Sequence, residues 1–152
     1  MPEKKTLENA KRDLRQGKSP STAAGEFVKE EIEHVRQGKH GARSTKQAIA
    51  IGLSKARRAG VPLPAPKRGK TSQSTRRSAQ QDLATGQGKR TPRAPSRKRS
   101  RAALQALKRE PKQAASSSAL SRHAKSVATR RRGKRGSTTR ASKRAAGTAS
   151  TG

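Results

Sequence analysis

Charge is distributed very unevenly along the chain, and this limits what its second half can fold into. Residues 1–66 contain 14 Lys and Arg and 7 Asp and Glu, whereas residues 67–152 contain 25 Lys and Arg and only 2 acidic residues. Such a basic segment repels itself and needs a polyanion to condense it, most often nucleic acid. We therefore expect a disordered basic C-terminal half.

Large apolar side chains are too few for a core that spans all 152 residues. Hydrophobic residues make up 27% of the chain and aromatic residues 1%, with one Phe and no Trp or Tyr. Low hydrophobicity combined with a net charge of +30 is typical of chains that stay largely unfolded. The expected fold is mostly α plus disorder, with a small N-terminal bundle of two or three short helices.

Helix signals are strongest around the middle of the first half. Ser44 and Gln47 have the spacing of a capping box, and Gly60 before Pro62 is a stop signal. These signals predict a helix over about 45–58, with an apolar stripe on one side and basic residues on the other. The stripe consists of Ile49, Leu53 and Ala56.

Two further helices are expected upstream, over 4–16 and about 23–37, each stopped by a glycine. The second helix carries an acidic face made of Glu26, Glu30 and Glu33. The bundle has few apolar anchors, so its stability is marginal, and a homodimer or a bound partner is one way to complete its core. The anchors are Leu14, Phe27, Val28, Ile32, Val35, Ile49 and Leu53.

Three prolines between residues 61 and 66 predict an extended linker, because each proline keeps its predecessor out of the α region. The expected organisation is a small helical module at 1–60 and a Pro-rich, then basic and disordered linker at 61–99. A marginal helical hairpin at 100–131 and a disordered basic tail at 132–152 complete the chain.

The sequence Lys-Gln-Ala-Ile-Ala-Ile-Gly-Leu-Ser at residues 46–54 is the most distinctive motif. With it, residues 8–66 resemble a family of small basic bacterial proteins of unassigned function that carry Lys-Gln-Ala-Ile-Ala-Ile-Gly/Ala-Leu-Ser, and residues 118–125 are also similar to such proteins. The resemblance implies a bacterial origin and no particular activity. The tail is similar in composition to bacterial histone-H1-like proteins, without their regular Lys-Pro-Ala-Ala repeats.

Several classes of chemistry have no support in the sequence. The absence of cysteine excludes disulfides and thiolate metal sites. We interpret His34, His40 and His123 as solvated or helix-end side chains, and expect no metal and no cofactor. No paired carboxylates, phosphate loop or nucleophile with a base is recognisable, so an enzyme is not expected. The longest apolar run is six residues, which predicts a cytoplasmic protein without a membrane span.

The function we expect is that of a nucleoid-associated, largely sequence-nonspecific protein that binds double-stranded DNA through its phosphates. An RNA-binding or ribosome-associated protein is an alternative, as is a protein-interaction adaptor whose helical module binds a partner. Residues 66–70 and 132–135 have degenerate AT-hook patterns. The near absence of aromatic residues argues against recognition of splayed single-stranded bases.

The residues expected to contact phosphates are basic side chains of the 45–58 helix and of the second half. They are Lys46, Lys55, Arg57, Arg58, Lys67, Arg68, Lys70, Arg97, Lys98, Arg99, Arg101, Arg130, Arg131, Arg132, Lys134 and Arg135.

Overall fold

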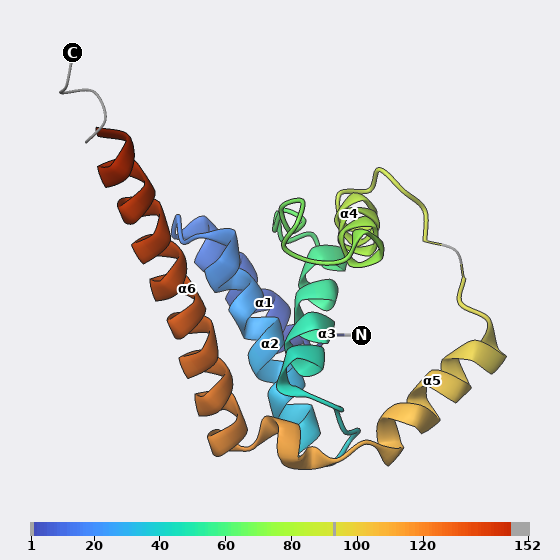
Figure 1. Cartoon of the computed structure of the whole chain (residues 1–152). Coiled ribbons are helices and arrows are strands. Elements are labelled where there is room, and N and C mark those ends of the chain that lie inside the picture. Colours follow the sequence, from blue (N-terminus) through green and yellow to red (C-terminus); the bar gives the residue numbers. More distant parts are fainter. Residues whose placement is uncertain (1, 93, 147–152) are drawn as a thin grey trace. The chain divides into compact units, whose positions relative to one another are not determined.

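The computed structural model describes residues 2–92 and 94–146, with side chains as far as residue 133, and this part of the chain is helical and without β-strands (Figure 1). The chain divides into two compact units, residues 1–116 and residues 117–152. The elements are α1 (Lys4–Arg15), α2 (Pro20–Arg36), α3 (Thr45–Arg58), α4 (Gln73–Gly86), α5 (Arg97–Arg109), the 3-10 helix η1 (Lys112–Ala115) and α6 (Ser117–Ala146).

The predicted fold class is wrong in its central point, because the described part of the basic half is not disordered. Helix α4 lies within the expected disordered linker, and α6 runs as far as Ala146, where a disordered tail was expected. No proline follows Pro111, and Ala, Arg and Lys are all strong helix formers. Helical propensity therefore outweighs the repulsion between neighbouring cations.

Helix α3 begins and ends at the predicted signals. Ser44 Oγ accepts a hydrogen bond from the Gln47 amide at 3.2 Å, and Gln47 Oε1 accepts one from the Arg43 amide at 2.7 Å. The chain leaves the helix through Gly60, whose φ of +93° is strained for a residue with a side chain. The predicted boundaries of this helix are confirmed.

Helices α2 and α3 approach closely because small residues line their contact. Ala48, Gly52 and Ala56 of α3 are buried, and a Cβ atom at Gly52 would lie 2.7 Å from the Cα atom of Val28 on α2. The buried stripe is therefore rotated from the predicted one, and Ile49 is only partly buried. Small side chains, rather than large ones, set the spacing of the bundle.

The 3-10 helix η1 returns the chain to the bundle from far along the sequence. Ala114 and Ala115 join a buried cluster that includes Val35 of α2. Thr45 Oγ1 donates to the Ala114 carbonyl at 2.6 Å, and Arg36 Nε donates to the Ala115 carbonyl at 2.9 Å. Residues beyond the expected 1–60 module thus complete the core of the first unit.

Helix α4 is held on α3 mainly by polar contacts. Asp82 accepts a hydrogen bond from Ser54 Oγ at 2.5 Å and forms an ion pair with Arg58 Nε at 2.9 Å. Ala79 is the only residue of α4 that is buried. A helix attached in this way has no apolar stripe, so apolar periodicity does not predict it. The available signal is Asp82, the only carboxylate between residues 67 and 109.

Gly52→Ala is expected to destabilise the protein by about 1–3 kcal/mol, because the added Cβ forces α2 and α3 apart. Gly25→Ala is the matched control, since no atom lies within 4 Å of a Cβ there. That control should stabilise α2 by about 0.5–1 kcal/mol through helix propensity alone. Urea unfolding measures both changes, and equal effects of the two substitutions would contradict the close helix contact.

Asp82→Asn is expected to loosen α4 by about 1–2 kcal/mol, because it removes the charge that binds Arg58 and weakens the bond to Ser54. Amide hydrogen exchange over residues 73–86 measures the loss of protection. Asp13→Asn on α1 is the control: it removes a carboxylate that lies 2.7 Å from Lys18 Nζ, and it should leave α4 unchanged. Unaltered exchange in Asp82→Asn would contradict the polar attachment.

Candidate nucleic-acid interface

Two of the cations expected to meet phosphates from α3 are paired within the protein. Lys55 Nζ lies 2.6 Å from Glu31 Oε2 and 4.0 Å from Glu30 Oε1, both carboxylates being buried. Arg58 is paired with Asp82 of α4. Lys55 and Arg58 therefore connect α3 to its neighbouring helices. Lys46, at the start of α3, is exposed and has no ion pair among the described residues.

Arg57 is a structural residue of the extended segment that follows α3. Its side chain is buried, and it donates to the carbonyls of Leu63 at 3.2 Å and Pro64 at 3.3 Å. Burial lowers the pKa of the Arg57 guanidinium, and the nearby Asp82 opposes that shift. The guanidinium therefore fixes the Pro-rich segment against α3 instead of facing solvent.

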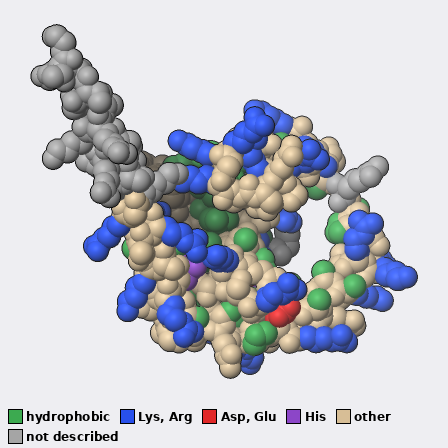
Figure 2. Space-filling view, viewed as in Figure 1, with side chains coloured by type: hydrophobic (Ala, Val, Ile, Leu, Met, Phe, Trp, Pro, Cys, Tyr) green, Lys and Arg blue, Asp and Glu red, His purple; other side chains and the backbone are tan. Residues whose placement is uncertain are grey.

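The remaining described cations of the predicted set are exposed and have no acidic partner among the described residues. They are Lys67, Arg68 and Lys70 before α4, Arg97, Lys98, Arg99 and Arg101 on α5, and Arg130, Arg131 and Arg132 on α6. Lys and Arg side chains project from the surface around α4 and along the outside of α5 (Figure 2). The side chains of Lys134 and Arg135 lie outside the described residues.

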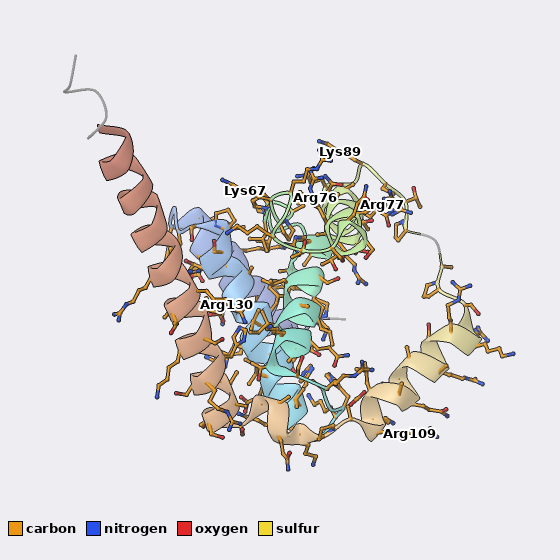
Figure 3. The ribbon with its side chains drawn as sticks, in the orientation of Figure 1. Lys67, Arg76, Arg77, Lys89, Arg109 and Arg130 are labelled. Carbon is orange, nitrogen blue, oxygen red and sulfur yellow. The ribbon has the colours of Figure 1, made fainter. Side chains whose placement is uncertain are left out.

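Further exposed or partly buried basic residues lie around α4 and at the end of α5, in addition to those predicted from the sequence. Figure 3 labels Arg76, Arg77 and Lys89 on or beside α4, and Arg109 at the end of α5. Arg68 and Arg76 line a polar cavity of about 360 Å³ together with Gly69, Thr71 and Gln73. Arg76 and Arg77 belong to α4, which was expected to be a disordered linker.

Neither degenerate AT-hook has the extended backbone that the motif requires. Residues 67–70 form a tight turn in which the Lys70 amide donates to the Lys67 carbonyl at 3.1 Å, with Gly69 at a φ of +81°. Residues 132–135 are part of α6. The AT-hook interpretation is therefore wrong for this conformation, and its cations are presented from a turn and a helix.

The first turn of α5 concentrates positive charge where a helix tolerates it least. Arg97, Lys98, Arg99 and Arg101 follow Ser96, which forms no side-chain capping bond, and α5 buries no residue. A helix N-terminus carries a partial positive charge, so cations there destabilise it and an anion stabilises it. The stability of α5 should therefore increase when phosphates approach this end.

The predicted acidic face of α2 is only partly a surface. Glu30 is buried and accepts a hydrogen bond from the Glu3 amide at 3.1 Å. Glu26 accepts one from Asn9 Nδ2 at 3.1 Å and is partly buried, whereas Glu33 is exposed. The interpretation of Glu26, Glu30 and Glu33 as one exposed face is wrong, because α1 covers part of that side of α2.

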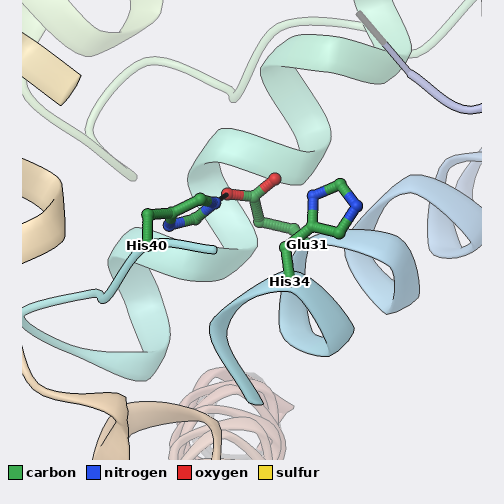
Figure 4. A group of neighbouring side chains, drawn as sticks. All are labelled: Glu31, His34 and His40. Atoms are coloured by element: carbon green, nitrogen blue, oxygen red, sulfur yellow. Dashed lines mark ion pairs between the residues drawn. The ribbon is translucent and has the colours of Figure 1, made fainter. Parts of the chain in front are cut away.

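Two histidines that we interpreted as solvated or helix-end side chains lie against a buried carboxylate. Glu31, His34 and His40 each offer an atom within 4.8 Å of the others (Figure 4). The side chains of His34 and His40 are 13% and 12% exposed. A hydrogen bond from His34, assisted by Lys39, lowers the pKa of the exposed Glu3 carboxyl.

The sequence did contain a signal for this cluster. Glu31 and His34 are three residues apart on one helix, which places them on the same face, and His40 follows in the next loop. His123 lies on α6 in the other unit and is not part of the cluster.

None of the described helices combines the length and the hydrophobicity that crossing a membrane requires.

Sequence comparison finds a related family only for the N-terminal part of the chain. No curated protein and no solved structure shows significant similarity to the chain. Residues 118–125 and the tail lie outside the family match, so their resemblances stay predictions. Residues 4–68, which contain α1 to α3 and the Pro-rich segment, match a family of unknown function (DUF6496).

Proposed function

We propose that this protein binds double-stranded DNA through its phosphates, largely without regard to sequence. The observation that carries the proposal is the concentration of unpaired cations in residues 67–152. Carboxylates of residues 1–66 pair with some of the cations beside them, such as Lys18, Lys39 and Lys55. Residues 67–152 have 25 Lys and Arg and 2 acidic residues, and the exposed cations before α4, on α5 and on α6 named above have no acidic partner in the described part of the chain. A duplex supplies the missing negative charge.

Helical presentation changes how the cations meet DNA. Helix α6 has 30 residues, which corresponds to roughly 45 Å of helix. B-DNA carries one phosphate charge per roughly 1.7 Å of its axis, and its major groove accepts an α-helix. Basic helices can therefore follow a groove or a phosphate ridge as preformed units, without the full ordering cost of a coil.

The composition favours backbone contacts over base readout. Lys and Arg dominate the exposed surface of α5, and aromatic side chains that could stack on bases are nearly absent from the chain. Lys55 and Arg58, expected from the sequence to face DNA, are occupied by Glu31 and Asp82. We therefore assign the contact to α4, α5, α6 and the segments beside them.

Replacing Arg97, Lys98, Arg99 and Arg101 by Gln should weaken DNA binding and flatten its salt dependence. If each cation neutralises one phosphate, the slope of log K against log salt should fall by about 3.6. The measurement is a salt titration of affinity for a duplex of random sequence. Gln preserves helix propensity, and circular dichroism checks that α5 remains folded.

The matched control replaces Lys4, Lys5, Lys11 and Arg12 of α1 by Gln, which removes the same charge from exposed positions in the less basic first half of the chain. This control should change the slope by less than about one. Equal losses in both variants would overturn the assigned interface. A structured RNA of equal phosphate number is titrated in parallel. If the protein binds this RNA more tightly than the duplex, RNA rather than DNA is its partner.

A further inference from the structure

We propose that Glu31, His34 and His40 form a binding site for one Zn²⁺ ion in the first unit. Glu31 and His34 belong to α2, and His40 belongs to the loop between α2 and α3. The two imidazole rings lie on either side of the Glu31 carboxylate (Figure 4), with their centroids 6.3 Å apart. Two nitrogen donors and one carboxylate oxygen form a ligand set that Zn²⁺ accepts with a fourth position left for water.

The site contains an unsatisfied buried oxygen. The Glu31 side chain is 1% exposed, and its Oε1 atom accepts no hydrogen bond from the described residues. His40 Nε2 lies 2.9 Å from this oxygen, without hydrogen-bond geometry. A buried carboxylate oxygen without a donor is costly, and a cation bound beside it removes that cost.

The histidine nitrogens that face away from Glu31 lie against oxygen acceptors. His40 Nδ1 lies 3.0 Å from the Gly41 carbonyl, which can only accept, so Nδ1 carries the proton and a neutral ring keeps its lone pair on Nε2. His34 Nε2 lies 3.2 Å from Glu3 Oε1, which leaves Nδ1 as its donor. Histidines that bind metals usually donate their other N–H to a carbonyl or a carboxylate, as both rings do here.

The surrounding charges permit a divalent cation. Lys55 occupies Glu31 Oε2 at 2.6 Å and leaves Oε1 for the metal. Glu3 and Glu30 add negative charge, and Lys39 lies 3.4 Å from Glu3 Oε1. With neutral histidines, the three carboxylates outnumber the two lysines by one. Imidazole ligands favour Zn²⁺ over Mg²⁺ or Ca²⁺, which prefer oxygen.

The ligand atoms need only a small movement to bind the ion. They lie within 4.8 Å of one another, and tetrahedral Zn²⁺ requires separations of about 3.4 Å. Rotation of the imidazole rings about their side-chain bonds can shorten these separations, and the loop that carries His40 can move toward Glu31. Bound Zn²⁺ would fix residues 37–44 to α2 and raise the melting temperature of the protein.

Calorimetric titration of the chelator-treated full chain with Zn²⁺ should give one site per chain with micromolar or tighter affinity. His34→Gln and His40→Gln should each lose this binding, whereas His123→Gln should keep it, since His123 lies outside the cluster. Glu3→Gln should weaken the affinity about tenfold by removing the negative charge of the group that binds His34 Nε2.

Co²⁺ gives a second readout that does not depend on stability. Visible absorption bands of tetrahedral Co²⁺ should appear in the unmodified chain and in His123→Gln, and should be absent from the other two histidine variants. Circular dichroism without metal verifies that all variants are folded. No Zn²⁺ binding at micromolar concentration, or equal binding by all three histidine variants, would overturn the site.

Discussion

The ion pair between Glu31 and Lys55 is the interaction on which the first unit depends most. Glu31 is completely buried on α2, and a buried carboxylate needs a counter-charge. Lys55 supplies it from α3 at 2.6 Å, across the close contact that Gly52 permits. The pair therefore fixes the rotation of α3 about its axis and turns its small residues, rather than its large ones, toward α2.

The same constraint explains why α3 is a poor candidate for binding DNA. Glu30 and Glu31, which are buried on α2, require a neighbouring cation or donor, and Lys55 of α3 is the cation that pairs with both. Arg57 and Arg58 are likewise committed, one to carbonyls of the Pro-rich segment and the other to Asp82. Charge that is used to hold helices together is not available to phosphates.

Local signals in the sequence predicted the first three helices, and non-local contacts decided the rest. The capping pair at Ser44 and Gln47 is a short-range feature, so spacing alone identified it. Helix α4 depends on one carboxylate that reaches back to α3, and η1 depends on two carbonyls that bind Thr45 and Arg36. Such polar contacts between distant segments leave no periodic pattern, and a low content of large apolar residues therefore suggested disorder where the described chain is helical.

The histidine cluster was missed for a related reason. His40 reaches Glu31 only because Gly38, at a φ of +75°, ends α2 and turns the chain. The composition shows a large excess of Lys and Arg over Asp and Glu, but it does not show where the acidic side chains lie in the folded chain. In this fold most of them gather around α1 and α2, where they can hold cations of the protein itself or a divalent metal ion. That concentration leaves the second half of the chain without acidic neighbours, so the proposed metal site and the proposed DNA contacts both follow from the same unequal distribution of carboxylates.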